Sequence, residues 1–290
     1  MDIRRDDSFV DAHGVRIHYS TWDRQDARAV VQLVHGLGEH SLRYARLAEA
    51  LLAAGYSVWA DDHRGHGRTG MEQHGGDRSR LGRLGPGGHR ATVDAVRELG
   101  RRARAAHPDV PLVLLGHSWG SLIAQILLNE HPAAVDAVVL SGTALRTPFD
   151  MNGGDLNRRH ASAGSTEYEW LSRDPAIVAA AAADPLMFAA KALKLFGLPD
   201  TLRLLGRPRR GLARERDVPI LMLVGSDDSF GGEASVAKLA RDYVERSGFR
   251  DVTAIVYEGA RHEVFNETNR GEVVADLITW LDEHVPVREG

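Results

Sequence analysis

Apolar residues along this chain fall into two patterns that alternate from one end to the other. Six short runs are apolar at nearly every position, which is typical of parallel strands that are buried on both faces. We therefore predict strands at residues 29–34, 56–60, 112–115, 137–140, 220–224 and 253–257. Two earlier runs, residues 8–12 and 15–19, are joined by His13-Gly14 and predict an antiparallel hairpin at the edge of a sheet.

Between the strand-like runs, apolar residues recur every three or four positions, as on the buried face of an amphipathic helix. This spacing predicts helices at residues 44–54, 91–106, 122–129, 234–246 and 273–284. Strands and helices that alternate at this scale predict an α/β protein with a mostly parallel, doubly wound sheet.

Residues 143–217 interrupt this rhythm, because they contain no good strand candidate. Two pairs, Asp174-Pro175 and Asp184-Pro185, each place a capping side chain before a proline that suits the first helical turn. We predict a helix from each pair, the second strongly apolar and ending at Gly197. An unstructured loop of this length would be unusual inside a compact domain. The sequence therefore predicts a helical cap over residues 143–217, inserted into a core made of residues 1–142 and 218–290.

The composition narrows the class of protein. The chain has 290 residues, of which 43% are hydrophobic and 26% charged, and this suits one globular domain with an insertion. A net charge of −4 gives no electrostatic reason to expect nucleic acid as a partner. The absence of cysteine excludes disulfides, thiol catalysis and cysteine-ligated zinc.

The sequence also bears on location. No apolar run approaches the roughly 20 residues of a membrane helix, and the first residues lack the pattern of a signal peptide. We expect a cytoplasmic protein that meets a membrane only at its surface. Exposed apolar residues of the cap would serve either such a transient contact or a homodimer.

The segment Gly116-His117-Ser118-Trp119-Gly120 stands between a predicted strand and a predicted helix. Strand, Gly-x-Ser-x-Gly and helix is the arrangement that places a serine on a strained turn above a sheet. Glycines at both ends suit it, since a Cβ there would obstruct the tight turn and the close approach of helix and strand. The pattern predicts that Ser118 is a nucleophile.

A serine hydroxyl needs a base that removes its proton and a carboxylate that orients that base. Both follow later predicted strands, in the chain order of serine, acid and histidine that this fold requires. The pair Asp227-Asp228 comes after residues 220–224, and His262 comes after residues 253–257. From spacing alone either aspartate could be the acid.

Two backbone N–H groups should stabilise the oxyanion of the transition state, each contributing on the order of 3 kcal/mol. We assign one to Trp119, at the positive end of the helix that follows the serine. The other is assigned to Leu37, in the loop after residues 29–34. Five histidines nearby lack a carboxylate arrangement of ligand type, so we do not interpret them as a metal site; they are His35, His40, His63, His66 and His74. We expect His63 and His66 to hold a turn beside the loop that contains Leu37.

Five blocks occur in a fixed order along the chain. They are His35-Gly36-Leu37-Gly38-Glu39-His40 with Arg43-Tyr44, Asp62-His63-Arg64-Gly65-His66-Gly67-Arg68-Thr69, Gly116-His117-Ser118-Trp119-Gly120, Gly225-Ser226-Asp227-Asp228, and Tyr257-Glu258-Gly259-Ala260-Arg261-His262-Glu263. Together they resemble the motifs of the monoacylglycerol lipase and lysophospholipase branch of the α/β-hydrolases. The resemblance covers nearly the whole chain, including Ser172-Arg173-Asp174-Pro175 in the cap.

The resemblance implies an α/β-hydrolase fold and a serine ester hydrolase that uses no cofactor. It implies single-chain acyl esters as substrates, monoacylglycerols first among them, and a cap that faces lipid. The family's aspartate corresponds to Asp228. This chain departs from the family at Trp119-Gly120-Ser121, where the family carries Met-Gly-Gly, and this substitution bears on the shape of the acyl pocket.

Several alternatives stay open at this point. Leu186, Phe188, Leu193 and Phe196 either line an acyl tunnel or form the interior of the cap. The arginines at 203, 207, 209, 210, 214 and 216 form either a solvated face or an approach to anionic lipid. Short-chain carboxylesterase, thioesterase and perhydrolase activities fit the same triad. A ligand-binding receptor on a hydrolase fold is the alternative from another class.

Overall fold

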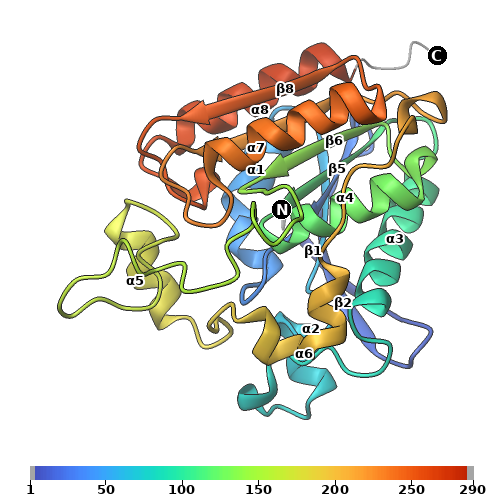
Figure 1. Cartoon of the computed structure of the whole chain (residues 1–290). Helices are drawn as coiled ribbons and strands as arrows, with labels where there is room; N and C mark the ends of the chain where they lie inside the picture. The colour runs from blue at the N-terminus through green and yellow to red at the C-terminus, as the bar shows by residue number, and fades with distance from the viewer. Residues whose placement is uncertain (1–3, 286–290) are drawn as a thin grey trace.

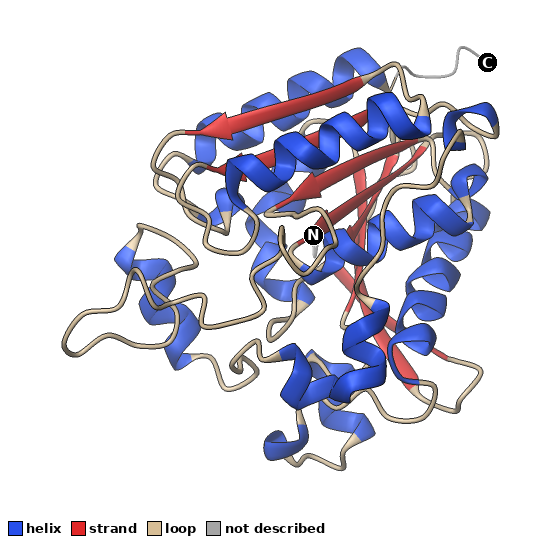
Figure 2. Cartoon of the chain, viewed as in Figure 1, coloured by secondary structure: helices blue, strands red, loops and turns tan. Residues whose placement is uncertain are grey.

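The computed structural model describes residues 4–285, and their strands form one eight-stranded sheet (Figures 1 and 2). Its order is β1-β2-β4-β3-β5-β6-β7-β8, and every neighbouring pair from β4 to β8 is parallel. The strands are β1 (Arg4–Val10), β2 (Arg16–Trp22), β3 (Val30–Val34), β4 (Ser57–Asp61), β5 (Leu112–His117), β6 (Ala137–Ser141), β7 (Ile220–Gly225) and β8 (Val252–Tyr257). All six predicted parallel strands and the edge hairpin are confirmed.

The edge hairpin has a local cause. Strands β1 and β2 pair antiparallel, and β2 joins the rest of the sheet through an antiparallel pairing with β4. At the turn, the Asp11 carboxylate accepts hydrogen bonds from the backbone N–H groups of His13 and Val15, both at 2.9 Å. An aspartate that bonds its own backbone two residues on is a common way to start a turn.

Helices cover both faces of the sheet. Side chains of α1 (Ala45–Ala53) and α8 (Arg270–His284) share one buried apolar cluster with one face of β3, β5, β6 and β7. Side chains of α3 (Gly88–Ala106), α4 (Trp119–Glu130) and α7 (Gly232–Arg241) pack on the opposite face. The predicted doubly wound architecture is therefore confirmed, and the carboxyl ends of the parallel strands open at one edge, where such folds hold their ligands.

Several helix boundaries in the core differ from the predictions, and α3, α4 and α8 each begin three residues earlier than predicted. The predicted helix 234–246 begins at Gly232 as α7 and changes to a π-helix at Asp242–Ser247. Helix α2 (Gly67–Gln73) was not predicted, because its sequence GRTGMEQ shows little apolar periodicity. Its first turn is held instead by Asp62, whose carboxylate accepts the Arg68 N–H at 3.0 Å and the Arg68 Nε–H at 2.7 Å.

The segment between β6 and β7 contains α5 (Pro175–Ala183) and α6 (Ala192–Arg203), and its described residues form no strand. Asp174 caps α5 as predicted, since its side chain accepts the N–H of Ala176 at 3.0 Å. The helix predicted from Asp184-Pro185 is wrong. Asp184 ends α5, its carboxylate contacts His40 at 2.9 Å, and the Phe188 N–H donates to the Gly38 carbonyl at 3.0 Å. These tertiary contacts keep residues 185–191 out of a helix.

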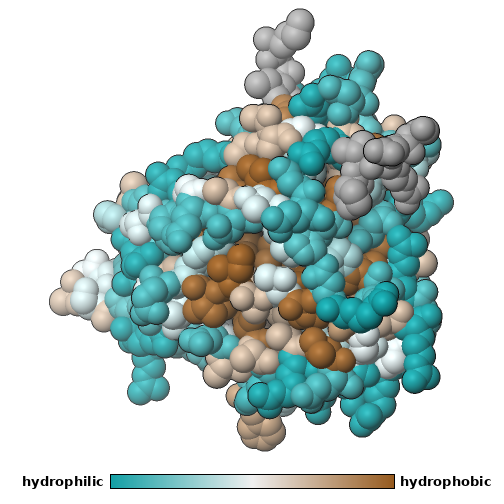
Figure 3. All heavy atoms as spheres, turned by 90° about the horizontal axis from the view of Figure 1, so that it is seen from above, coloured by the Kyte–Doolittle hydropathy of each residue, from teal (hydrophilic) through white to brown (hydrophobic). Residues whose placement is uncertain are grey.

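Within residues 4–285, no helix is long and apolar enough to cross a membrane. Figure 3 shows one face of the molecule, on which brown apolar residues gather in the middle and teal polar residues surround them. Large side chains that are more than half exposed include Leu193, Leu198 and Leu202 of α6 and Phe149 in the loop after β6.

Candidate active site

Ser118 lies on the sharp turn between β5 and α4. Its φ of +52° and ψ of −122° are unfavourable for an L-residue, and no other non-glycine in the described part of the chain has a positive φ. A Cβ at Gly116 would collide with the Gly120 carbonyl, and a Cβ at Gly120 would collide with the Val34 carbonyl. The two glycines thus permit the close turn that holds Ser118 in a strained position, and such strain is typical of functional sites.

His262 and Asp228 lie together at the same edge of the sheet. Asp228 follows β7, His262 follows β8, and the His262 Nδ1 atom is 2.9 Å from Asp228 Oδ1. Both side chains are almost completely buried. Burial alone would raise the pKa of Asp228, but His262 and the N–H of Phe230 hold this pKa below its ordinary value. An ionised carboxylate therefore faces the imidazole.

The structure distinguishes the two adjacent aspartates that the sequence left open. Asp227 points to the segment after β6, where it forms an ion pair with Arg159 at 2.9 Å. Its side chain is 42% exposed. Only Asp228 is in a position to orient His262.

Ser118 and His262 line one cavity of about 490 Å³. The His262 Nε2 atom is buried and has no hydrogen-bond partner among the described residues, so it is not bonded to Ser118 here. Because Nδ1 donates to Asp228, Nε2 carries the lone pair that could accept a proton. Hydrogen bonds between a catalytic serine and histidine are often long in unliganded structures and shorten when substrate binds.

The loop after β3 contributes a second side of this cavity. Leu37 lines the cavity, and the backbone N–H groups of Leu37 and Trp119 have no acceptor within the described part of the chain. The neighbouring Gly36 N–H donates to Glu39 Oε1 at 2.5 Å, and the Tyr44 hydroxyl donates to the same oxygen at 2.7 Å. Glu39 thereby fixes the loop and leaves the Leu37 N–H unused.

A buried ion triangle connects this loop to the histidine. Arg43 Nη1 is 3.0 Å from Glu39 Oε2, and Arg43 Nη2 is 2.9 Å from Glu263 Oε2. Burial and the nearby Glu263 carboxylate raise the pKa of Glu39, while Arg43 lowers that of Glu263. These three residues lie in the motif blocks of the sequence, but their contact could not be predicted, because Arg43 and Glu263 are 220 residues apart in the chain.

His63 and His66, the two histidines predicted to hold a turn, pack against His35 beside the loop after β3. The rings of His35 and His63 stack with centroids 3.8 Å apart, and the His63 N–H donates to His35 Nε2 at 3.0 Å. Burial lowers the pKa of His35 well below its ordinary value and that of His66 to about 3. The rings of His35 and His66 are therefore neutral at physiological pH. Across residues 4–285, no group of three or more His, Cys, Asp or Glu side chains could hold a metal ion.

Trp119 fills the space beside this histidine group. Its ring lies 5.2 Å from His66 and 5.1 Å from Phe196, measured between centroids. The side chain is 3% exposed and belongs to the apolar cluster under α3 and α4. The departure from the family motif at this position thus places a large buried ring behind the nucleophile.

The four apolar residues expected at an acyl tunnel lie in different places. Phe188 lines the cavity together with Met187. Leu193 is 59% exposed on α6, Phe196 packs against the core cluster, and Leu186 lies outside the cavity lining. The reason is the later start of α6, which leaves residues 187–191 as a non-helical segment that lines the cavity. Further lining comes from residues 153–157 and 166–168.

The arginines after α5 are mostly paired with carboxylates. Arg207 contacts Asp242 at 2.6 Å, and Arg209 contacts Glu215 at 2.7 Å. Arg203 and Arg216 contact Asp200 and Asp136. This arrangement favours a solvated face with internal charge balance.

Comparison with known proteins agrees with this geometry. The serine aminopeptidase S33 family of hydrolases matches residues 25–269. The chain belongs to this family. It is 34% identical to the monoacylglycerol lipase of Mycolicibacterium smegmatis, over 97% of this chain and 98% of that protein. It is 30% identical to human monoglyceride lipase, over 88% of this chain and 83% of that protein.

A solved structure is similar over the same length. A thermostable carboxyl esterase from Bacillus coagulans, crystallised with glycerol, has a TM-score of 0.80 and 26% identity, and covers 98% of this chain and 99% of that one. The expected α/β-hydrolase fold and the resemblance to the monoacylglycerol lipase branch are both confirmed.

Proposed function

We propose that this protein is a serine ester hydrolase that cleaves single-chain acyl esters, with monoacylglycerols as the first candidates. The observation that carries the proposal is the Asp228–His262 pair on the same cavity as the strained Ser118. The names of the relatives support an ester substrate, and the partly apolar cavity wall at Met187 and Phe188 supports an acyl chain.

In the proposed reaction, the Ser118 oxygen attacks the acyl carbon while His262 Nε2 takes the hydroxyl proton. Asp228 stabilises the imidazolium that forms and holds its tautomer. The N–H groups of Leu37 and Trp119 stabilise the oxyanion. His262 then returns the proton to the leaving alcohol, and water, deprotonated by His262, releases the carboxylic acid from Ser118.

Residues 143–217 act in this proposal as a cap over the core formed by residues 1–142 and 218–290. The support is the position of residues 153–157 and 187–191, which line the cavity opposite the sheet. The cap would close around the acyl ester and exclude water from the acyl carbon until the alcohol has left.

Replacement of Ser118 by Ala tests the nucleophile. We expect turnover of a monoacylglycerol to fall by roughly 10⁵–10⁶-fold, as in other triad knockouts. A fluorophosphonate probe should label the wild-type protein at Ser118 and leave the variant unlabelled. Ser79, an exposed serine outside the cavity lining whose hydroxyl donates to Asp77 at 2.7 Å, provides the matched Ser79→Ala control. Full turnover by a folded Ser118→Ala protein would refute the proposal.

A substrate series tests the substrate class. Monoacylglycerols and p-nitrophenyl esters of increasing chain length, an acyl thioester, and an aminoacyl p-nitroanilide should be compared by kcat/KM. We expect the highest value for medium or long single-chain esters. A maximum at the shortest esters would indicate a general carboxylesterase, a maximum at the thioester a thioesterase, and a maximum at the anilide the peptidase activity that the family's description names. Labelling without turnover would indicate a binding protein.

We further propose a cytoplasmic protein that touches membrane surfaces transiently through α6. The support is the exposure of Leu193, Leu198 and Leu202, which are 59%, 60% and 53% exposed. Cosedimentation with phospholipid vesicles should detect the contact, and a Leu198→Ser, Leu202→Ser double variant should lose it. If the double variant instead converts a dimer to a monomer in solution, the face joins two copies of the chain.

A further inference from the structure

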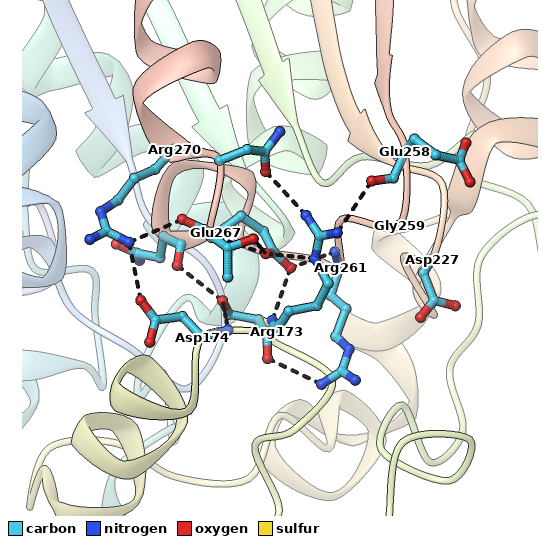
Figure 4. A network of polar contacts seen from close by, with 12 residues as sticks. Arg173, Asp174, Asp227, Glu258, Gly259, Arg261, Glu267 and Arg270 are labelled. Carbon is cyan, nitrogen blue, oxygen red and sulfur yellow. Dashed lines mark hydrogen bonds and ion pairs between the residues drawn. The ribbon is translucent and has the colours of Figure 1, made fainter.

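A second polar network, centred on Glu267, lies beside the loop after β8 that carries His262 (Figure 4). Residues 258–263 of this loop are called the histidine loop below. The Glu267 side chain is fully buried, although it carries a carboxylate. Figure 4 shows it among Arg173, Arg261 and Arg270. Burial of a carboxylate reduces stability unless both oxygens accept hydrogen bonds. The partners of Glu267 therefore indicate its role.

Each oxygen of Glu267 connects separate parts of the chain. Oε1 accepts the Arg261 N–H at 2.8 Å and the Arg173 N–H at 3.0 Å. Oε2 accepts the Arg173 Nε–H at 3.0 Å and the Thr268 N–H at 2.8 Å. Arg261 immediately precedes His262, and Arg173 leads into α5, so one carboxylate holds the histidine loop and the segment before α5 together.

The same two segments also run side by side. The His262 N–H approaches the Trp170 carbonyl at 3.4 Å, and the Glu263 N–H donates to the Leu171 carbonyl at 2.8 Å. The Trp170 ring lies 4.6 Å from the His262 ring, measured between centroids. Segment 170–173 therefore forms one wall of the space in which the imidazole sits.

The charges around Glu267 keep it ionised. Burial alone would raise its pKa, but the N–H groups of Arg261, Arg173 and Thr268 and the Arg173 guanidinium together lower it. Arg270 pairs with Asp174 at 3.1 Å, and the Arg261 guanidinium donates to the carbonyls of Glu169 and Ser172.

We propose that Glu267 is a positioning residue. It ties residues 170–173, which lead into α5, to the loop that carries His262, so that the placement of the imidazole depends on the segment between β6 and β7. The inference rests on the proposed role of His262 as the base. A misplacement of about 1 Å at a catalytic group can reduce the rate by roughly 100-fold. The network is the structural means by which a change in residues 170–174 would reach the reacting atoms.

The test compares Glu267→Gln, Arg173→Gln and the double variant. Glutamine retains an oxygen for two backbone N–H groups, but its amide N–H₂ would face the Arg173 Nε–H and the Thr268 N–H, which are also donors. We expect kcat to fall by roughly 10–100-fold in each single variant, with KM changed by less than about twofold. The kcat of the double variant should fall no further than that of the more impaired single variant, because both substitutions break the same Glu267–Arg173 contact. Arg173→Lys should recover part of the rate.

Two readouts separate positioning from a merely structural role. The rate of fluorophosphonate labelling at Ser118, measured per folded molecule, should fall with kcat, and the acidic limb of the pH profile of kcat/KM should shift. Arg250→Gln is the matched control, since Arg250 forms an exposed pair with Asp217 far from the triad.

The outcomes are distinguishable. If Glu267→Gln lowers thermal stability while labelling and kcat per folded molecule stay at the wild-type level, the network is structural and this inference fails. If the wild-type protein is not labelled at Ser118 at all, the proposed function fails with it. Additive losses in the double variant would show that Glu267 and Arg173 act independently, and would also overturn the inference.

Discussion

The sheet and the segment between β6 and β7 differ sharply in how they are held. Every residue of β3, β5, β6 and β7 is buried, whereas α5 buries only Ala181 and α6 buries none of its residues. Helix α6 is also broken at Gly197, where φ is +74° and ψ is 171°. The sheet is stabilised by large buried clusters on both faces, whereas the segment has only a small apolar cluster of its own, made of Trp170, Leu171 and Ala181.

This difference assigns separate tasks to the two regions. Ser118 and Asp228 follow the fully buried strands β5 and β7, and His262 follows the edge strand β8, so their relative positions depend on the sheet. The opposite cavity wall comes from loosely packed residues such as 153–157 and 187–191. Substitutions at the strand ends should therefore change kcat, and substitutions in the segment between β6 and β7 should change the substrate preference.

The largest expected effect is at Asp228. Asp228→Asn should lower kcat by roughly 10⁴-fold, because the amide would present a donor to His262 Nδ1 and favour the wrong tautomer. Asp227→Asn is a control one residue away, exposed and paired with Arg159, and should stay within about threefold of the wild type. The kcat values of the two variants, measured on one ester substrate, would show which aspartate is the catalytic acid. Equal losses in both variants would contradict the assignment of the acid.

The next effect is on stability. Leu115 of β5 is completely buried, and Leu115→Ala should reduce the free energy of unfolding by about 3 kcal/mol, since it removes buried apolar surface and leaves a cavity. Chemical denaturation monitored by circular dichroism would measure the change. A loss below about 1 kcal/mol would mean that the sheet is less tightly packed than its burial indicates.

The same contrast explains how much the sequence alone could predict. Strands such as 112–115 and 220–224 were found because a strand buried on both faces must be apolar at every position. The order of Ser118, Asp228 and His262 was found because each follows an apolar run, although the run before His262 forms the edge strand β8, which is only partly buried. Helix α6 was misplaced because Asp184 carries a capping signal that its contact with His40 overrides.

Side-chain networks were beyond reach for a related reason. Arg43 meets Glu263, and Arg173 meets Glu267, only after segments far apart in sequence have packed together. A buried carboxylate and an exposed one look the same in a sequence. Spacing can therefore identify the triad, which recurs in a fixed chain order, but not the ion pairs that support it.

A smaller effect is expected at Asp62, which lies buried at the end of β4. Its carboxylate accepts the Arg68 Nε–H at 2.7 Å and the Ser41 hydroxyl at 2.6 Å, and these contacts lower its pKa despite burial. The stabilisation should be complete above the unfolded-state pKa near 4 and be lost as pH falls through the lower folded value. Asp62→Asn should therefore cost about 2 kcal/mol at pH 7 and progressively less below pH 4.

Urea denaturation at pH 7, 5 and 3.5 would measure that dependence. Glu215→Gln is the matched control from the other region, because Glu215 forms an exposed pair with Arg209, and its stability difference should be small at every pH. A constant difference across this pH range for Asp62→Asn would show that the ionised form of Asp62 does not contribute.

The smallest effect is expected on α6. Leu202 is 53% exposed, so Leu202→Ala removes few contacts and should change the free energy of unfolding by less than about 0.5 kcal/mol. The substitution has the same chemistry as Leu115→Ala, and only the burial differs. Measured side by side by denaturation, the two variants should differ by more than about 2 kcal/mol. A comparable loss in both would mean that α6 is packed in solution as tightly as the sheet.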